Sequence, residues 1–70
     1  MSAWVVLKNG KVLKYNNCYH IVHSLKNYLL RDKENGRLLA VIPSENIERF
    51  EFERPSKIYR EKRKDKLPTI

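Results

Sequence analysis

Three short runs of apolar and aromatic residues lie between residues 27 and 52, and turn-forming residues separate them. The first two runs flank Asn35-Gly36, a pair that tolerates the positive φ angles of a tight hairpin. Pro43 ends the second run, because proline fixes φ and lacks a backbone N–H. The pattern predicts three strands, the first two paired antiparallel, with one helical turn over residues 44–47 that Ser44 caps before the last strand.

A second hairpin is expected near the start of the chain, over residues 3–15. Residues 4–7 and 12–15 are rich in β-branched and aromatic side chains, and Asn9-Gly10 lies between them. Asn16-Asn17 then interrupts the pattern, because asparagine side chains compete for backbone hydrogen bonds and favour turns.

Residues 18–25 alternate between two faces, which favours a strand. One face holds Tyr19, Ile21, His23 and Leu25, and the other holds His20, Val22 and Ser24. A helix over residues 18–30 is the alternative, because apolar residues there also fall at helical spacings. The strand is preferred, since residue types enriched in strands cluster here and no strong helix former precedes Leu25. Lys26-Asn27 is the expected turn into the next strand.

The last predicted strand alternates phenylalanines with charged residues. Phe50 and Phe52 point to one side and are expected to close the core, while Arg49 and Glu51 point to the other. A core this small cannot hold every remaining ring of the chain. Among those rings, Trp4 is the first candidate for the core.

Six short strands joined by tight turns, with one helical turn before the last, resemble the small β-barrels of the Src-homology-3-like and Sm-like classes. The stretch Ile42-Pro43-Ser44-Glu45-Asn46-Ile47 resembles the short-helix connection before the final strand of such barrels. The resemblance covers residues 3–54 and implies an all-β fold, a small antiparallel barrel of five or six strands. No ligand site follows from it, since the chain lacks both an Ala-Leu-Tyr-Asp-Tyr type stretch and the N-terminal helix of Sm-type ring formers. The compact plan also resembles small uncharacterised proteins of bacteria and their phages.

The composition is that of one small soluble domain. Of the 70 residues, 41% are hydrophobic and 33% are charged, which suits a folded rather than a disordered chain. Cys18 is the single cysteine, so an intramolecular disulfide is excluded. No apolar run approaches the roughly 18 residues of a membrane span, and no signal peptide is recognisable at the start. These features predict a cytoplasmic protein with no membrane partner.

The basic charge is concentrated at the C-terminal end. The chain carries a net charge of +7 with a pI near 9.8. Residues 55–70 hold six of the 15 basic residues and two of the eight acidic ones, a net +4, against +3 for residues 1–54. This shift predicts a barrel domain over residues 1–54 and a basic arm over residues 55–70, either extended or a short helix capped by Ser56.

The basic arm is the best candidate for a functional site. Lysine and arginine neutralise phosphates and release counterions, and an interleaved tyrosine stacks on an unpaired base. The predicted nucleic-acid-binding residues are Lys57, Tyr59, Arg60, Lys62, Arg63, Lys64 and Lys66. Tyr15 or Tyr28 would add stacking. Two alternatives are a solvated tail without a ligand and an arm that docks on a partner protein.

The histidines and the cysteine offer little for chemistry. His20 and His23 are three residues apart, so a strand places them on opposite faces, where they cannot share a metal. Cys18 and His20 share a face, but zinc needs at least three protein ligands and a thiolate nucleophile needs an oriented base. The chain is therefore expected to be non-enzymatic, with no catalytic residue, metal or cofactor.

Two functions are consistent with these patterns. The leading hypothesis is a non-enzymatic nucleic-acid-binding module for DNA or RNA that uses the basic arm on phosphates. The alternative is a protein-interaction module, such as a small phage-type inhibitor or an adaptor that associates with itself as a homo-oligomer. The net positive charge favours the first, and the acidic residues around the last strand favour the second.

Overall fold

The computed structural model describes residues 1–60 of the chain. These residues contain no helix long and apolar enough to cross a membrane. Their regular elements are strands and one 3-10 helix. In chain order they are β1 (Ala3–Leu7), β2 (Val12–Tyr15), β3 (His20–Ser24), β4 (Asn27–Arg31), β5 (Leu38–Pro43), η1 (Ser44–Asn46), β6 (Ile47–Phe52) and β7 (Ile58–Arg60).

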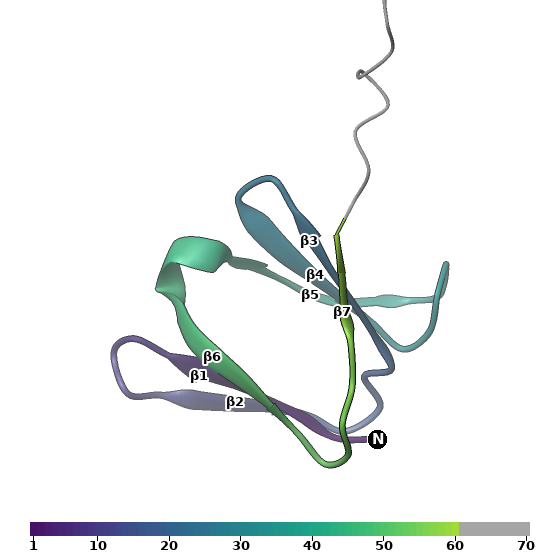
Figure 1. The fold of residues 1–70 in the computed structure, drawn as a ribbon, viewed down its shortest axis with the longest axis horizontal. Coiled ribbons are helices and arrows are strands. Elements are labelled where there is room, and N and C mark those ends of the chain that lie inside the picture. The colour runs from purple at the N-terminus through teal and green to yellow at the C-terminus, as the bar shows by residue number, and fades with distance from the viewer. Residues whose placement is uncertain (61–70) are drawn as a thin grey trace, which may run out of the picture.

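The strands form two sheets that face each other across one core (Figure 1). The three-stranded sheet has the order β2-β1-β6, and its pairs are antiparallel. The four-stranded sheet has the order β5-β4-β3-β7. Its β3–β4 and β4–β5 pairs are antiparallel, whereas β7 runs parallel to β3.

The predicted all-β class is confirmed, but the arrangement differs from the expected antiparallel barrel of five or six strands. The sheets are not closed into a barrel, and the described residues include a seventh strand and a parallel pair. The seventh strand lies in the segment predicted as the basic arm. It joins the fold because Ile58 pairs with Ile21 of β3 and packs against the core.

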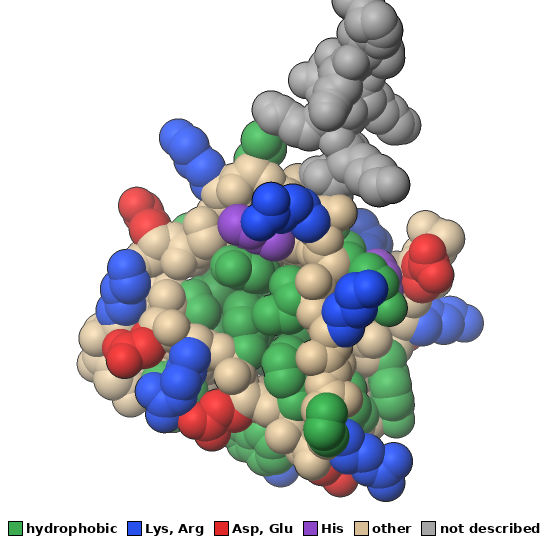
Figure 2. All heavy atoms as spheres, in the orientation of Figure 1, with side chains coloured by type: hydrophobic (Ala, Val, Ile, Leu, Met, Phe, Trp, Pro, Cys, Tyr) green, Lys and Arg blue, Asp and Glu red, His purple; other side chains and the backbone are tan. Residues whose placement is uncertain are grey.

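The edge strands β6 and β7 belong to different sheets, and side chains fill the space between their ribbons in the view of Figure 1. Figure 2 shows hydrophobic side chains gathered in the middle of this face. Aromatic contacts hold the two sheets together: Tyr28 of β4 meets Phe50 of β6 edge-to-face, with ring centroids 4.9 Å apart. Phe50 also stacks near Phe52 at 6.2 Å. Such a ring pair contributes about 0.5–1.5 kcal/mol beyond the area it buries.

The hairpin turns fall close to the predicted places. Gly10 adopts a φ of 94°, and Asn35 adopts 61°, so each Asn-Gly pair supplies one left-handed residue to its turn. The turn predicted at Lys26-Asn27 lies one residue earlier, because Ser24 pairs with Asn27. Ser44 does not cap η1 as predicted; its hydroxyl donates instead to the Lys26 carbonyl at 3.0 Å.

Two register shifts adjust which side chains face inward. Opposite β1, Leu7 pairs with Ile47 and Val6 with Arg49, so Glu48 is an extra residue in β6. This bulge lets Ile47 and Phe50 both face the core although they are three residues apart. A matching shift opposite β4 makes Leu39 the extra residue of β5, and Leu39 packs against the core.

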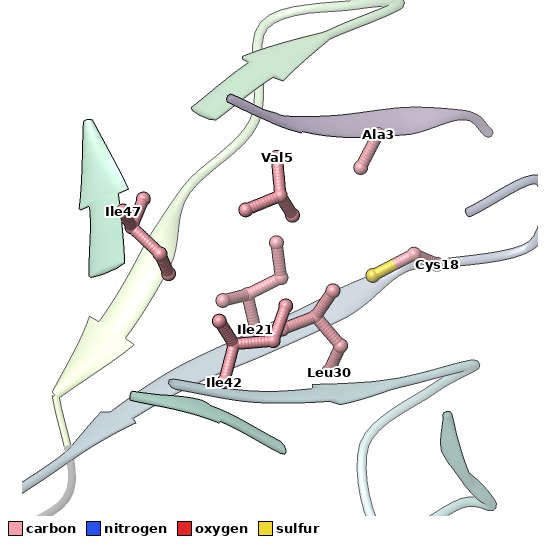
Figure 3. Packing of buried hydrophobic residues seen from close by; sticks show 7 residues of the cluster. All are labelled: Ala3, Val5, Cys18, Ile21, Leu30, Ile42 and Ile47. Atoms are coloured by element: carbon pink, nitrogen blue, oxygen red, sulfur yellow. The ribbon is translucent and has the colours of Figure 1, made fainter. Parts of the chain in front are cut away.

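The core is built from small and branched side chains of both sheets and of the β2–β3 connection, which point toward one another (Figure 3). Its buried members are Ala3, Val5, Cys18, Ile21, Leu30, Ile42 and Ile47. Phe50 and Phe52 pack against this cluster, as predicted. The prediction that Trp4 fills the core is wrong. Trp4 alternates with the fully buried Ala3 and Val5, so its ring lies on the outer face of β1.

Leu25 generates a stability prediction, because it has a φ of 51° and its side chain is 74% exposed. A non-glycine residue in the left-handed region costs roughly 1–2 kcal/mol. We expect Leu25→Gly to raise the free energy of unfolding by about 0.5–1 kcal/mol, once the greater backbone entropy of glycine is counted. Urea unfolding measures this change. Leu25→Ala is the control and should change stability by less than about 0.5 kcal/mol. A destabilised Leu25→Gly would contradict the expectation.

Candidate nucleic-acid interface

The acidic residues of the strands are confined to one sheet. The strands β3, β4, β5 and β7 contain no aspartate or glutamate among their residues, and they carry Arg31 and Arg60. In the three-stranded sheet, β6 carries Glu48 and Glu51. The four-stranded sheet therefore presents strand side chains that do not repel a polyanion.

The outer face of the four-stranded sheet carries a row of apolar side chains that crosses all four strands. Cross-strand partners place Tyr59, Val22, Leu29 and Val41 side by side, from β7 through β3 and β4 to β5. We call these four residues the apolar row. Val22 and Leu29 alternate with the buried Ile21 and Leu30, which places the row on the side away from the core. Tyr59 is 43% exposed and Val41 is 48% exposed.

A cluster of rings and cations lies at the β7 end of this row. The Tyr59 ring stacks on the His20 imidazole, with centroids 4.7 Å apart and planes inclined by 25°. The Lys57 ammonium lies over the same tyrosine ring, 5.1 Å from its centroid. Arg31 is the cross-strand partner of His20 on β4. We call Lys57, Tyr59 and His20 the Tyr59 cluster.

The structure brings together some of the predicted site residues and separates others. Lys57 and Tyr59 share the outer face, whereas Arg60 pairs with His23 and belongs to the opposite face of β7. The predicted residues Lys62, Arg63, Lys64 and Lys66 lie outside the described residues. The prediction from charge and composition did not include His20 or the aliphatic residues of the apolar row, Val22, Leu29 and Val41. The alternation of residues 18–25 contains the signal, because it sets His20 and Val22 apart from Ile21.

The two histidines lie on opposite faces of β3, as strand geometry predicts. His20 stacks on Tyr59, and His23 stacks on Tyr28 with centroids 4.3 Å apart. His20 Nδ1 and His23 Nε2 are buried and have no hydrogen-bond partner within residues 1–60. In the same part of the chain, no group of three or more His, Cys, Asp or Glu side chains is placed to hold a metal ion.

The Cys18 thiol is buried, with 1% of the residue exposed. Burial raises the pKa of this thiol above its ordinary value of 9.0, against the weaker opposing effect of backbone hydrogen bonds from His20 and Arg31. Near neutral pH the group is therefore a protonated thiol in the core, not a thiolate. A pocket of about 540 Å³ lies beside η1 and is lined by Lys26, Asn27, Pro43, Ser44 and Glu45, without Cys18.

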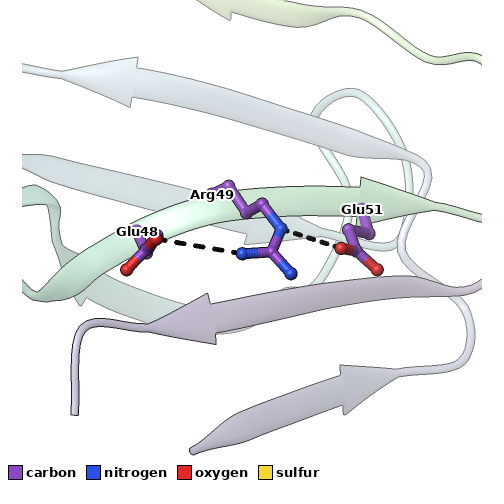
Figure 4. A network of polar contacts seen from close by, with 3 residues as sticks. All are labelled: Glu48, Arg49 and Glu51. Carbon is purple, nitrogen blue, oxygen red and sulfur yellow. Dashed lines mark hydrogen bonds and ion pairs between the residues drawn. The ribbon is translucent and has the colours of Figure 1, made fainter. Parts of the chain in front are cut away.

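The three-stranded sheet presents a different outer face, on which charges are paired. The Arg49 Nε donates to Glu51 Oε2 at 2.8 Å, and Arg49 Nη1 lies 3.9 Å from Glu48 Oε2 (Figure 4). All three side chains are more than half exposed, so the pairs add little stability. Their charges nevertheless make this face a poorer surface for phosphates than the four-stranded sheet.

Comparison with protein-family models, with curated proteins and with solved structures found no match for this chain.

The buried thiol predicts a pH dependence of stability. Because the pKa of Cys18 is raised in the folded state, the unfolded thiol ionises first as the pH rises above about 9. The stabilising effect of the neutral thiol is therefore complete below that pH and is lost toward the folded-state pKa. We expect the unfolding free energy of the wild type to fall more steeply above about pH 9 than that of Cys18→Ala. Urea unfolding at several pH values measures both slopes.

The comparison with Cys18→Ala removes the contribution of tyrosines and lysines that titrate in the same range. Equal slopes for the two proteins would contradict the prediction. So would a thiol reagent that modifies native Cys18 as fast as it modifies the unfolded chain.

Proposed function

We propose that this chain is a non-enzymatic module that binds single-stranded nucleic acid on the outer face of its four-stranded sheet. The observation that carries the proposal is the Tyr59 cluster, an exposed ring with a lysine and a histidine against it. The cluster lies on a sheet whose strands have no carboxylate. The likeness to Src-homology-3-like and Sm-like barrels remains a prediction, and the proposed binding does not depend on it.

Tyr59 supplies a platform for an unpaired base. The His20 imidazole stacks against the tyrosine ring and favours one orientation of it. The Lys57 contact over the ring is worth about 0.5–1 kcal/mol at an exposed site. Stacking of a base on an aromatic ring is worth about 1–3 kcal/mol, so a base displaces the ammonium. On its flexible stem, Lys57 then reaches the adjoining phosphate.

The rest of the face extends this contact along the sheet. Val22, Leu29 and Val41 continue the apolar row away from Tyr59 and offer an apolar surface to further bases and sugars. Arg31 lies next to His20 across the β3–β4 pair. One of its Nη1 hydrogens goes to the Gly36 carbonyl at 3.2 Å, which anchors the guanidinium and leaves other donors of the fork for a phosphate.

The distribution of charge favours the same face. The net charge of +7 attracts a polyanion, and the carboxylates of Glu48 and Glu51 lie on the other sheet. Four more of the predicted residues, Lys62, Arg63, Lys64 and Lys66, follow closely after β7 in the sequence and add cations to that end of the chain. A single strand suits this surface better than a duplex, because only unpaired bases expose their faces to an aromatic ring.

The protein-interaction alternative uses the same exposed apolar row. An aromatic and aliphatic surface with nearby arginine also suits a protein partner, in which case phosphate contacts are absent and binding depends weakly on salt. The salt dependence of binding therefore separates the two functions.

The stacking role of Tyr59 predicts a loss of affinity when its ring is removed. We expect Tyr59→Ala to weaken binding to a single-stranded oligonucleotide about 5- to 100-fold, since one stacked base is lost. Tyr59→Phe should bind nearly as the wild type, because the ring remains. Fluorescence anisotropy with labelled DNA and RNA strands measures both.

Tyr19→Ala is the matched control, because Tyr19 is another exposed tyrosine, at 59%, outside the apolar row. It should bind as the wild type. Circular dichroism establishes that each variant is folded. A folded Tyr59→Ala that binds as tightly as Tyr19→Ala would remove the basis of the proposal.

The phosphate role of Lys57 predicts a smaller salt dependence in Lys57→Ala. When one phosphate of a single strand is no longer neutralised by the protein, the slope of log K against log salt falls by about 0.7. We expect that reduction in Lys57→Ala, with weaker binding at low salt for every base sequence tried. Titrations over a range of salt concentrations measure the slope. Lys8→Ala, a change of the same charge in the exposed β1–β2 turn, should leave the slope unchanged.

A further inference from the structure

The outer face of the three-stranded sheet carries a row in which a cation, a ring and an anion follow one another. Trp4 of β1 has Lys14 as its partner on β2 and Glu51 as its partner on β6. All three lie on the side away from the core, since Trp4 alternates with the buried Ala3 and Val5. The row is therefore positive at one edge, aromatic in the centre and negative at the other edge.

Such a row is complementary to its own copy. A two-fold axis parallel to β1 and passing through Trp4 exchanges the β2 edge with the β6 edge. Lys14 of one copy then faces Glu51 of the other, twice by symmetry, and the two Trp4 rings meet on the axis. The same axis keeps the strands of both copies aligned, which is the usual arrangement of sheets packed face to face.

The neighbouring row fits the same symmetry. Val6 of β1 has Val12 as its partner on β2 and Arg49 on β6. The axis places Val6 against its own copy, and Val12, which is 54% exposed, against the stem of Arg49. No like charges face each other in either row.

In a single copy, Lys14 and Glu51 each make a contact within the chain. Association of two copies replaces these contacts with contacts between the copies. The Lys14 ammonium lies over the Trp4 ring, 5.5 Å from its centroid, and Glu51 accepts from Arg49. Both contacts are at the surface, and exposed contacts of these kinds are worth little. They do not prevent Lys14 from turning to a carboxylate on a second copy.

We propose that a second copy of this chain docks on the outer face of the three-stranded sheet and forms a two-fold symmetric dimer centred on Trp4. Three strands and five residues span about 14 Å by about 17 Å. A face of this size gives a small interface, so the dimer is weak and reversible, with a dissociation constant in the micromolar range or above. The proposal does not rest on nucleic-acid binding, because the Tyr59 cluster lies on the other sheet.

Charge reversal on the full chain tests the symmetry directly. Sedimentation velocity from about 5 µM to about 1 mM gives the dissociation constant of the wild type. We expect Lys14→Glu and Glu51→Lys each to raise it at least about tenfold, because each places two like-charged pairs in the interface. An equimolar mixture of the two variants should dimerise again, since position 14 of each copy then faces an opposite charge at position 51 of the other.

Lys26→Glu and Glu34→Lys are the matched controls, because both change the same charges at exposed positions in turns of the other sheet. They should dimerise nearly as the wild type. The proposal is overturned by a wild type that stays monomeric up to about 1 mM. It is equally overturned by single variants that dimerise normally, by a mixture that does not recover, or by open-ended assembly in place of a dimer.

Discussion

The phase of alternation along each strand is the constraint on which the rest of this molecule depends. A strand of three to six residues offers only two or three side chains to the core, so the loss of one inward position is a large part of what that strand buries. The extra residues Glu48 and Leu39 restore the phase where simple alternation would turn Ile47 or Leu39 outward. The same alternation determines which side chains lie on the outer faces of the sheets, because each strand residue that does not face the core faces outward.

Those outer faces differ in character because the sheets differ in charge. On the four-stranded sheet, aliphatic residues and Tyr59 alternate with the core residues, and its strands have no carboxylate. On the three-stranded sheet, Glu51 and Arg49 share the surface with Trp4. Sequence composition averages the two into a mildly basic domain with an acidic last strand. The fold separates them, which removes the objection that the acidic residues raise against a nucleic-acid surface.

The sequence could predict the local features of the fold because they depend on local chemistry. The Asn-Gly turns, the stop at Pro43 and the inward direction of Phe50 and Phe52 follow from dihedral preferences and period-two alternation. Alternation predicts that Trp4 and Val5 face opposite sides of β1, but it does not predict which of the two sides is the core. The tertiary packing of the two sheets places Val5 in the core. The sequence also could not predict the parallel pairing of β7 with β3, because a strand of only three residues, Ile58–Arg60, shows too little alternation to be recognised. The same holds for the candidate site. Lys57 and Tyr59 could be predicted from their basic and aromatic segment, but the stacking of His20 on Tyr59 depends on the pairing of β7 with β3.

The two outer faces also constrain each other through charge. A dimer joined through its three-stranded sheets carries its two four-stranded sheets on opposite sides, so each copy presents its Tyr59 cluster to solvent. Each copy has a net charge of +7, and the repulsion between copies opposes the dimer at low ionic strength. A bound polyanion neutralises that charge. If nucleic acid binds on one sheet and a second copy docks on the other, as proposed, each event favours the other without any contact between the two sites, because the polyanion reduces the repulsion between the copies and the dimer presents more positive charge to the polyanion.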